Sequence, residues 1–289
     1  MITERQPICT VHRGRGKEER PIPYTLVISL SVVIINMDQN VIKKIAKLLT
    51  AAKRPLFITG AGISAESGLP TYRGISGLYN SGLTAEGIPI EDAISGEMWK
   101  RNPSICWKYI YQIGAACFEK TYNAAHEFIA QVEEEKPDTW VLTQNIDGYH
   151  KSAGSKNVIE IHGHLRSQLC NVCDTEWWGS MYLSSPLLDM PRCPECDSLL
   201  RPNVVLFGEQ LQDKACDTYQ IEMMKGFDIV FSIGTTSIFP YIAQPIHDAT
   251  EKFIPTVEIN PGRTDVTDHV AFKLECGAVE AFEEIKKYL

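Results

Sequence analysis

The stretch Pro55-Leu-Phe-Ile-Thr-Gly-Ala-Gly-Ile-Ser-Ala-Glu-Ser-Gly68 decides the fold of this chain. Its mostly apolar start predicts a short buried strand that ends in a glycine-rich turn. The dinucleotide fingerprint G-x-G-x-x-G would need a third glycine where the chain has Ala65, so a tight turn with no ligand stays the alternative to a nucleotide site. Tyr72 and Arg73 then add a ring for stacking and a cation for phosphate, unless Arg73 forms a surface salt bridge.

Four further apolar runs predict strands at residues 140–143, 158–161, 228–233 and 256–259. The last two are followed at once by glycine or small polar residues. Buried strands with such loops at their carboxyl ends are typical of a parallel sheet that holds a nucleotide. With a helical pattern of apolar residues over 41–52, the sequence predicts an α/β fold with a Rossmann-like parallel sheet.

Four cysteines, Cys170, Cys173, Cys193 and Cys196, form two C-x2-C pairs that are 19 residues apart. This spacing allows two short turns to offer four thiolates to one tetrahedral Zn2+. Disulfides are the alternative, but the chain has an odd total of nine cysteines, and disulfide frameworks belong mainly to small secreted proteins. We therefore predict a structural zinc whose four protein ligands leave no position for a catalytic water.

The length of 289 residues and the 44% content of hydrophobic residues allow one large domain and a smaller one. We expect residues 37–289 to form the main domain, with insertions at about 75–125 and 166–203 that build the smaller part and a zinc ribbon at 170–196. The net charge of −8 argues against direct nucleic-acid binding, which needs a basic surface.

Residues 1–36 differ from the rest, because a stretch rich in Arg and Lys precedes an apolar run at 24–35. The run is shorter than the ~20 residues that a membrane-spanning helix needs, and no small-x-small cleavage site follows it. We therefore expect an N-terminal extension that is disordered or not translated, with Met37 as the natural start. We also expect no membrane partner and a cytoplasmic location, since export would expose the thiolates to oxidation.

Polar side chains stand where predicted strands end. Gln144, Asn145 and Asp147 follow one strand and can hydrogen-bond hydroxyls or an amide. Capping of the next helix is the alternative for Asn145 or Asp147. His162 follows another strand beside Gly163, and it suits a general base with a pKa near the working pH, unless it is structural.

The chain thus carries, in order, the turn at 60–68 with Pro70-Thr-Tyr-Arg73, the segments 143–147 and 162–163, the paired cysteines, and the segments 201–209, 234–237 and 259–260. This order resembles the sirtuin family of NAD-dependent protein-lysine deacylases over residues 40–289. The resemblance implies a Rossmann-like large domain, a smaller domain of zinc ribbon and helices, and catalysis in the cleft between them. It also implies that NAD is consumed as a co-substrate and that acylated lysine peptides or proteins are the partners.

In the mechanism that the resemblance implies, the acyl-amide oxygen attacks C1′ of the nicotinamide ribose, and nicotinamide leaves. His162 then activates a ribose hydroxyl that attacks the resulting alkylimidate, and water completes the release of free lysine and O-acyl-ADP-ribose. Asn145 would position the reacting ribose or a water near it, and Asp147 would hold the nicotinamide carboxamide. The implied catalytic residues are therefore His162, Asn145 and Asp147.

The resemblance also implies the residues that bind the two substrates. Those expected at NAD surround its pyrophosphate, nicotinamide and adenosine, and they are Gly60, Ala61, Gly62, Ile63, Glu66, Tyr72, Arg73, Gln144, Asn145, Ile146, Asp147, Gly234, Thr235, Thr236, Ser237, Asn260, Pro261, Gly262 and Ala278. Those expected to pair through an edge strand with an extended substrate peptide are Val205, Leu206, Phe207, Gly208 and Glu209.

The chain departs from the family pattern at His164, where Asn is usual, at Thr71-Tyr72 and at Gly148-Tyr149, but no implied catalytic group is lost. Relatives that prefer succinyl or malonyl lysine carry Tyr and Arg where this chain has Ile110 and Ile113. Because an apolar lining would leave an acyl carboxylate buried and unpaired, we expect neutral acyl groups as substrates.

Two other activities stay open as alternatives. One is a mono-ADP-ribosyltransferase that uses NAD with a protein nucleophile, which would leave label from NAD on protein instead of on a small molecule. The other is a non-catalytic module that binds NAD or acyl-lysine. A hydride-transferring dehydrogenase is disfavoured by the missing third glycine.

Overall fold

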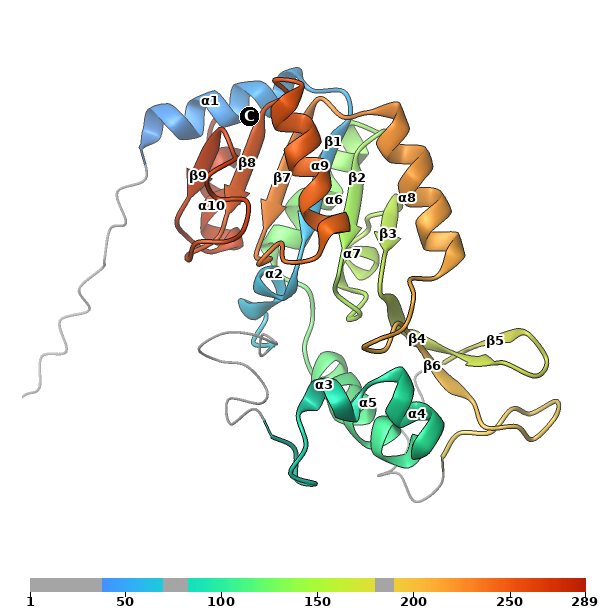
Figure 1. Ribbon diagram of the computed structural model, residues 1–289. Coiled ribbons are helices and arrows are strands. Elements are labelled where there is room, and N and C mark those ends of the chain that lie inside the picture. The colour runs from blue at the N-terminus through green and yellow to red at the C-terminus, as the bar shows by residue number, and fades with distance from the viewer. Residues whose placement is uncertain (1–37, 70–82, 180–189) are drawn as a thin grey trace, which may run out of the picture. The chain divides into compact units, whose positions relative to one another are not determined.

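The computed structural model describes residues 38–69, 83–179 and 190–289, and its larger part is built on a six-stranded parallel sheet (Figure 1). The strands lie in the order β3-β2-β1-β7-β8-β9. The sheet grows from β1 through β2 to β3 on one side and through β7 and β8 to β9 on the other, so its topological switch point lies between β1 and β7. The bounds are β1 Pro55–Thr59, β2 Trp140–Thr143, β3 Val158–Glu160, β7 Ile229–Ile233, β8 Thr256–Ile259 and β9 Phe272–Leu274.

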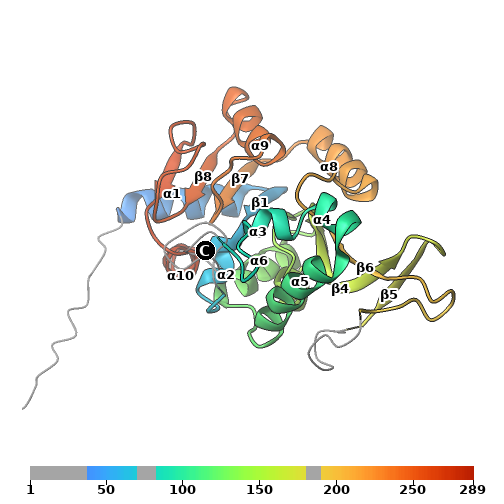
Figure 2. The same ribbon diagram turned by 60° about the horizontal axis from the view of Figure 1, so that its bottom comes forward.

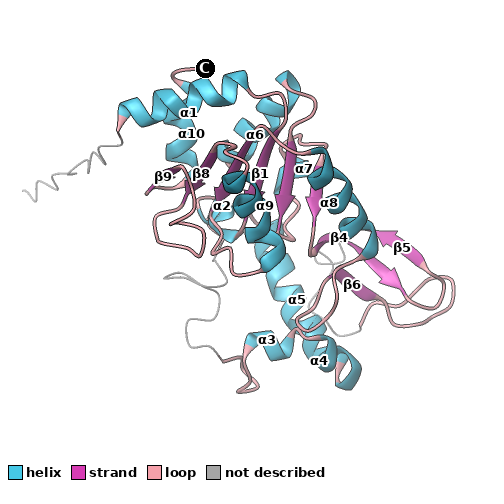
Figure 3. Cartoon of the chain, turned by 45° about the horizontal axis from the view of Figure 1, so that its top comes forward, coloured by secondary structure: helices cyan, strands magenta, loops and turns pink. Residues whose placement is uncertain are grey.

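Helices cover both faces of this sheet (Figure 3). On one face, α1 (Gln39–Ala51), α6 (Ala124–Glu135) and α10 (Ala278–Lys286) share an apolar cluster with Phe57 and Phe231. On the other face, α9 (Pro240–Glu251) and α8 (Asp213–Lys225) pack with Leu56 and Val230. All residues of β1 and β7 are buried, which explains why these strands are continuous apolar runs in the sequence.

The smaller part combines three helices with a three-stranded antiparallel sheet (Figure 2). The helices are α3 (Ile90–Ala93), α4 (Gly96–Arg101) and α5 (Pro103–Phe118), and the sheet has the order β5-β4-β6, with β4 Gly163–Cys170, β5 Thr175–Trp178 and β6 Arg201–Val204. Leu165 and Leu206 join the apolar cluster of α5, and Trp107 of that helix donates its indole N–H to the carbonyl oxygen of Leu200 at 3.0 Å. Helices and sheet therefore pack as one apolar unit.

The fold class expected from the sequence is confirmed. The strands at 55–59, 140–143 and 256–259 have the expected bounds, whereas β3 and β7 are each one residue shorter. The helix expected over 41–52 begins two residues earlier, because the Asp38 side chain accepts a hydrogen bond from the N–H of Asn40 and caps it. The three-residue β9 was not expected, and so short a run carries too little pattern to show in the sequence.

No helix among the described residues combines the length and the apolar character that crossing a lipid bilayer would require. The apolar run at 24–35 and the expected start at Met37 lie outside the described residues. The boundaries expected for the main domain and its insertions stay predictions.

Candidate functional site

The carboxyl ends of β1 and β7 meet at the switch point through glycine backbones. Gly62 donates its N–H to the carbonyl oxygen of Gly234 at 2.8 Å, and a Cβ atom on Gly62 would lie 2.5 Å from the Cα atom of Gly234. A Cβ on Gly60 would likewise lie 2.8 Å from the Gly234 carbonyl oxygen. Ala65, by contrast, is exposed in the short helix α2 (Ala61–Ala65), so no third glycine is needed. Gly60, Gly62 and Gly234 are therefore required first by the close contact between the turns that follow β1 and β7.

The segment after β2 forms hydrogen bonds with the turns that follow β1 and β7. Gln144 donates from Nε2 to the Thr235 hydroxyl at 2.7 Å, and Asn145 donates from Nδ2 to the Gly60 carbonyl oxygen at 3.0 Å. Asn260, which follows β8, donates from Nδ2 to the carbonyl oxygen of Thr235 at 3.1 Å. The ends of β1, β2, β7 and β8 therefore form one connected polar edge, as expected for a ligand site at a switch point.

Asp147 is held by two different partners. Its Oδ1 accepts from the N–H of Tyr149 at 2.9 Å at the start of α7 (Tyr149–Ser152), so the capping alternative describes one of its contacts. Its Oδ2 accepts from the Ser64 hydroxyl at 2.8 Å, and burial raises the pKa of this carboxyl. The capping alternative does not describe Asn145, because its side chain bonds Gly60 and Ser64.

His162 is oriented at both ring nitrogens. Its Nδ1 donates to the carbonyl oxygen of Gln144 at 3.1 Å, and its Nε2 lies 2.7 Å from the Tyr241 hydroxyl. Burial lowers the pKa of His162, so the ring is neutral near pH 7. A neutral ring that donates through Nδ1 has its free lone pair on Nε2, which makes Nε2 the atom that can take up a proton.

Most of the other expected NAD residues lie within the described part of the chain. The backbone of Gly234 and the side chains of Thr235 and Asn260 join the polar edge, while Ile63 is fully buried in the core. Glu66 accepts a hydrogen bond from the N–H of Val279 at 2.9 Å, which puts its carboxylate at the start of α10 beside Ala278. Thr236, Pro261 and Gly262 are exposed, and Tyr72 and Arg73 lie outside the described residues.

Two family departures have structural explanations. Gly148 adopts a φ of 78°, which favours glycine, and the Tyr149 hydroxyl donates to the buried carbonyl oxygen of Cys117 at 2.8 Å. His164 stacks on Trp178 with ring centroids 5.1 Å apart and lies 3.7 Å from a Glu176 carboxylate oxygen. The side chain of His164 therefore packs on residues of β5 in the three-stranded sheet.

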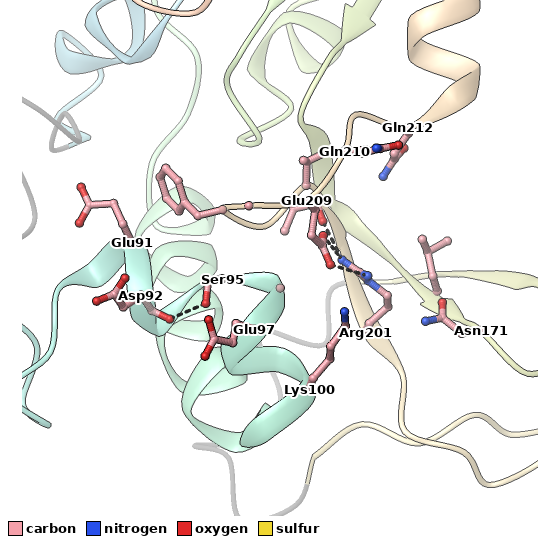
Figure 4. Close-up of a pocket in the computed structure, with 16 residues that line it drawn as sticks. Glu91, Asp92, Ser95, Glu97, Lys100, Asn171, Arg201, Glu209, Gln210 and Gln212 are labelled. Carbon is pink, nitrogen blue, oxygen red and sulfur yellow. Dashed lines mark hydrogen bonds and ion pairs between the residues drawn. The ribbon is translucent and has the colours of Figure 1, made fainter.

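The segment expected to bind substrate borders a pocket of about 760 Å³ between α3, α4 and β6 (Figure 4). Glu209 pairs with Arg201 through two hydrogen bonds of 2.8 and 3.1 Å and accepts from the N–H of Leu206 at 3.0 Å. Phe207 pairs through its backbone with residues 94–96, whereas Gly208 makes no hydrogen bond within the described part of the chain. His162 and Gln144 do not line this pocket, so it lies outside the polar edge.

The four cysteines of the paired motifs come together as a zinc site requires. Their sulfur atoms all lie within 4.8 Å of one another, with Cys170–Cys196 at 3.6 Å and Cys173–Cys193 at 3.9 Å. Four sulfurs at 2.3 Å from a tetrahedral Zn2+ would be about 3.8 Å apart, so the set fits this ion. Each C-x2-C pair is followed by an aspartate with positive φ, Asp174 and Asp197, which closes the turn around the ligands.

Several contributors to the site could not be found from the sequence. His126 lies 3.5 Å from the Ser64 hydroxyl through Nε2, and burial lowers its pKa to about 4. His150 bonds the Thr59 hydroxyl at 2.9 Å, and its ring centroid lies 4.8 Å from that of His126. No spacing in the sequence links these residues to one another, because they meet only through tertiary packing.

Fold and site together define an α/β nucleotide-binding protein whose polar edge lies at the switch point and whose smaller part carries a cysteine site for zinc. The sequence profile of the Sir2 family matches residues 60–239. This match covers more than half of the chain, and the chain belongs to the Sir2 family.

Relatives with named activities and solved structures agree with this membership. The chain is 47% identical to NAD-dependent protein deacylase 2 of Pseudomonas aeruginosa over 86% of this chain and 97% of that protein. It is similar to a crystal structure of a Sir2 homologue in complex with NAD, with a TM-score of 0.75, 31% identity and coverage of 85% and 93% of the two chains. A Sir2 complex with a p53 peptide and NAD+ matches with a TM-score of 0.72 and 27% identity, covering 85% and 97%.

Proposed function

We propose that this protein is an NAD-dependent protein deacylase that consumes NAD and frees the lysine of an acylated protein. Its relatives are named as such deacylases, and its structural neighbours include complexes with NAD and with a peptide. The observation that carries the proposal is the position of His162. Its Nδ1 is held by the backbone of Gln144, whose side chain reaches Thr235 across the polar edge.

In this proposal His162 is the general base. It accepts at Nε2 the proton of an NAD ribose hydroxyl, whose oxygen then attacks the acyl carbon. Asn145 holds the nicotinamide ribose, and Asp147 holds the carboxamide, while Gln144, Thr235 and the residues around Asn260 bind the rest of NAD. The bonds of Asn145 to Gly60 and of Asp147 to Ser64 keep both side chains at the polar edge before NAD arrives.

The smaller part would bind the peptide and set the acyl preference. The unbonded backbone of Gly208, within the described residues, can pair with an extended peptide as an added strand. Ile110 and Ile113 are buried in the apolar cluster that also holds Leu206, which supports a preference for neutral acyl groups. We expect an acetyl peptide to exceed its succinyl counterpart in kcat/KM by at least about tenfold, since a buried unpaired carboxylate is costly. The opposite order would refute the preference.

The cysteine site has a structural part in this proposal. Cys170, Cys173, Cys193 and Cys196 would hold Zn2+ and fix β4, which begins directly after His162. A cytoplasmic location and the absence of nucleic-acid and membrane partners belong to the proposal as well. They are supported by the thiolate ligands and by the net charge of −8.

The test is the release of nicotinamide from NAD, with and without an acetyl-lysine peptide, in wild type and His162→Ala. We expect peptide-dependent release that falls by about 100-fold or more in the variant, as for the loss of a general base. His269→Ala, which removes an exposed histidine outside the site, is the matched control. Label transfer from NAD to protein, without deacylation, would instead support the ADP-ribosyltransferase alternative.

A further inference from the structure

Tyr241 forms a hydrogen bond with Nε2 of His162, the atom that accepts the proton in the proposed reaction. Its hydroxyl lies 2.7 Å from Nε2, while Nδ1 of the same ring faces the carbonyl oxygen of Gln144 at 3.1 Å. A carbonyl oxygen can only accept, so Nδ1 carries the hydrogen of the neutral ring. Nε2 then has a lone pair, and the Tyr241 hydroxyl must be the donor in this hydrogen bond.

The aromatic surroundings fix the ring from a second direction. Phe239 and Tyr241 stack on each other at the start of α9, with ring centroids 5.5 Å apart and planes 11° from parallel. The His162 ring meets both edge-on, at 5.7 Å from Phe239 and 5.9 Å from Tyr241. His162 is therefore held by two hydrogen bonds along its plane and by an aromatic pair across it, which leaves it one orientation.

We propose that Tyr241 is a positioning residue of the reaction: it holds His162 with Nε2 as the proton acceptor, and a ribose hydroxyl of NAD replaces its hydroxyl at that atom. This inference rests on the proposed function, because it presupposes that His162 is the base. In the exchange, the Tyr241 hydroxyl keeps its proton, moves away from Nε2 and donates to another acceptor. The proton that His162 later receives comes from the ribose hydroxyl, so Tyr241 starts and ends as a neutral phenol.

The Tyr241→Phe variant tests this role, because it removes only the hydroxyl and keeps the ring that packs on Phe239. In the implied mechanism nicotinamide leaves before the base acts, so two rates can be separated. One is the exchange of labelled free nicotinamide into NAD in the presence of acetyl-lysine peptide, and the other is complete deacylation. We expect deacylation to fall by about 5- to 10-fold, the factor that one hydrogen bond supplies, with the exchange rate and the KM for NAD within about twofold of wild type.

Tyr219→Phe is the matched control, because Tyr219 is a partly buried tyrosine on α8 that packs against the same apolar cluster as α9. It should leave both rates unchanged. Equal losses of exchange and deacylation in Tyr241→Phe would overturn the inference, because they would indicate a general structural defect. Unchanged or faster deacylation would also overturn it, since the hydroxyl would then be idle or an obstruction. A wild-type protein that shows neither rate would instead disprove the proposed function itself.

Discussion

The polar edge of the parallel sheet and the cysteine module of β4–β6 are stabilised in different ways. The edge stands on large apolar clusters on both faces of the sheet, and hydrogen bonds between distant segments only complete it. Around the cysteines, the buried apolar cluster consists of Cys170, Cys193 and Leu200 alone among the described residues. Burial of apolar surface can hold the first region, whereas the second needs the metal.

Removal of zinc should therefore have the largest effect. Structural zinc in small domains contributes on the order of 10 kcal/mol, so Cys173→Ser should unfold the module and abolish deacylation. The parallel sheet should keep its thermal transition, because its core does not include the cysteines of the motif. Limited proteolysis within 163–204 measures the loss, and Cys216→Ser, outside the module, is the control. Full activity of metal-free protein would remove the distinction between the two regions.

Gly62→Ala should give the next largest effect, at the polar edge. The new Cβ atom would lie 2.5 Å from the Cα atom of Gly234, and neither backbone can yield without shifting β1 or β7. We expect the free energy of unfolding to fall by about 2–4 kcal/mol, as for overpacking at a rigid contact. Gly262→Ala is the control for urea unfolding, since its nearest neighbour is a side-chain oxygen of Asn260 at 3.9 Å. An equally small effect in both variants would show that the backbone at Gly62 and Gly234 can shift at little cost.

Acid should weaken the two regions through different groups. Burial lowers the pKa of His126 from 6.5 to about 4 in the folded protein. Between these two values the unfolded chain binds a proton at His126 that the folded chain does not bind. The free energy of unfolding should fall as the pH drops from 6.5 toward 4, by about 2 kcal/mol at pH 5 from this residue. Zinc release adds to the fall in wild type. His126→Asn should remove the contribution of this one histidine, whereas His150, whose pKa burial also lowers, should still weaken the fold in acid.

What the sequence could predict follows the same division. The strands of the sheet and the cysteine ligands are local signals, apolar runs and a fixed spacing, and the structure has both. The sequence predicted only part of the role of the glycines, because the contact of Gly62 with Gly234 depends on β1 and β7 being neighbours in the sheet. His126 and Tyr241 were missed, since only the packing of α6 and α9 brings them to Ser64 and His162. The sequence shows which chemistry is present, but tertiary packing decides how each group is held.

Ala65→Gly should have the smallest effect, and it tests whether the polar edge follows the dinucleotide fingerprint at all. The Ala65 methyl group is exposed at the end of α2, away from the contact between Gly62 and Gly234. A glycine there should lower the free energy of unfolding by about 0.5–1 kcal/mol through helix propensity. The KM for NAD should stay within about twofold, because one hydrogen bond or close approach would be worth more. A severalfold lower KM would show instead that the missing third glycine limits how closely the turn approaches the pyrophosphate. The contact between Gly62 and Gly234 would then not be the main reason for the glycines of the turn.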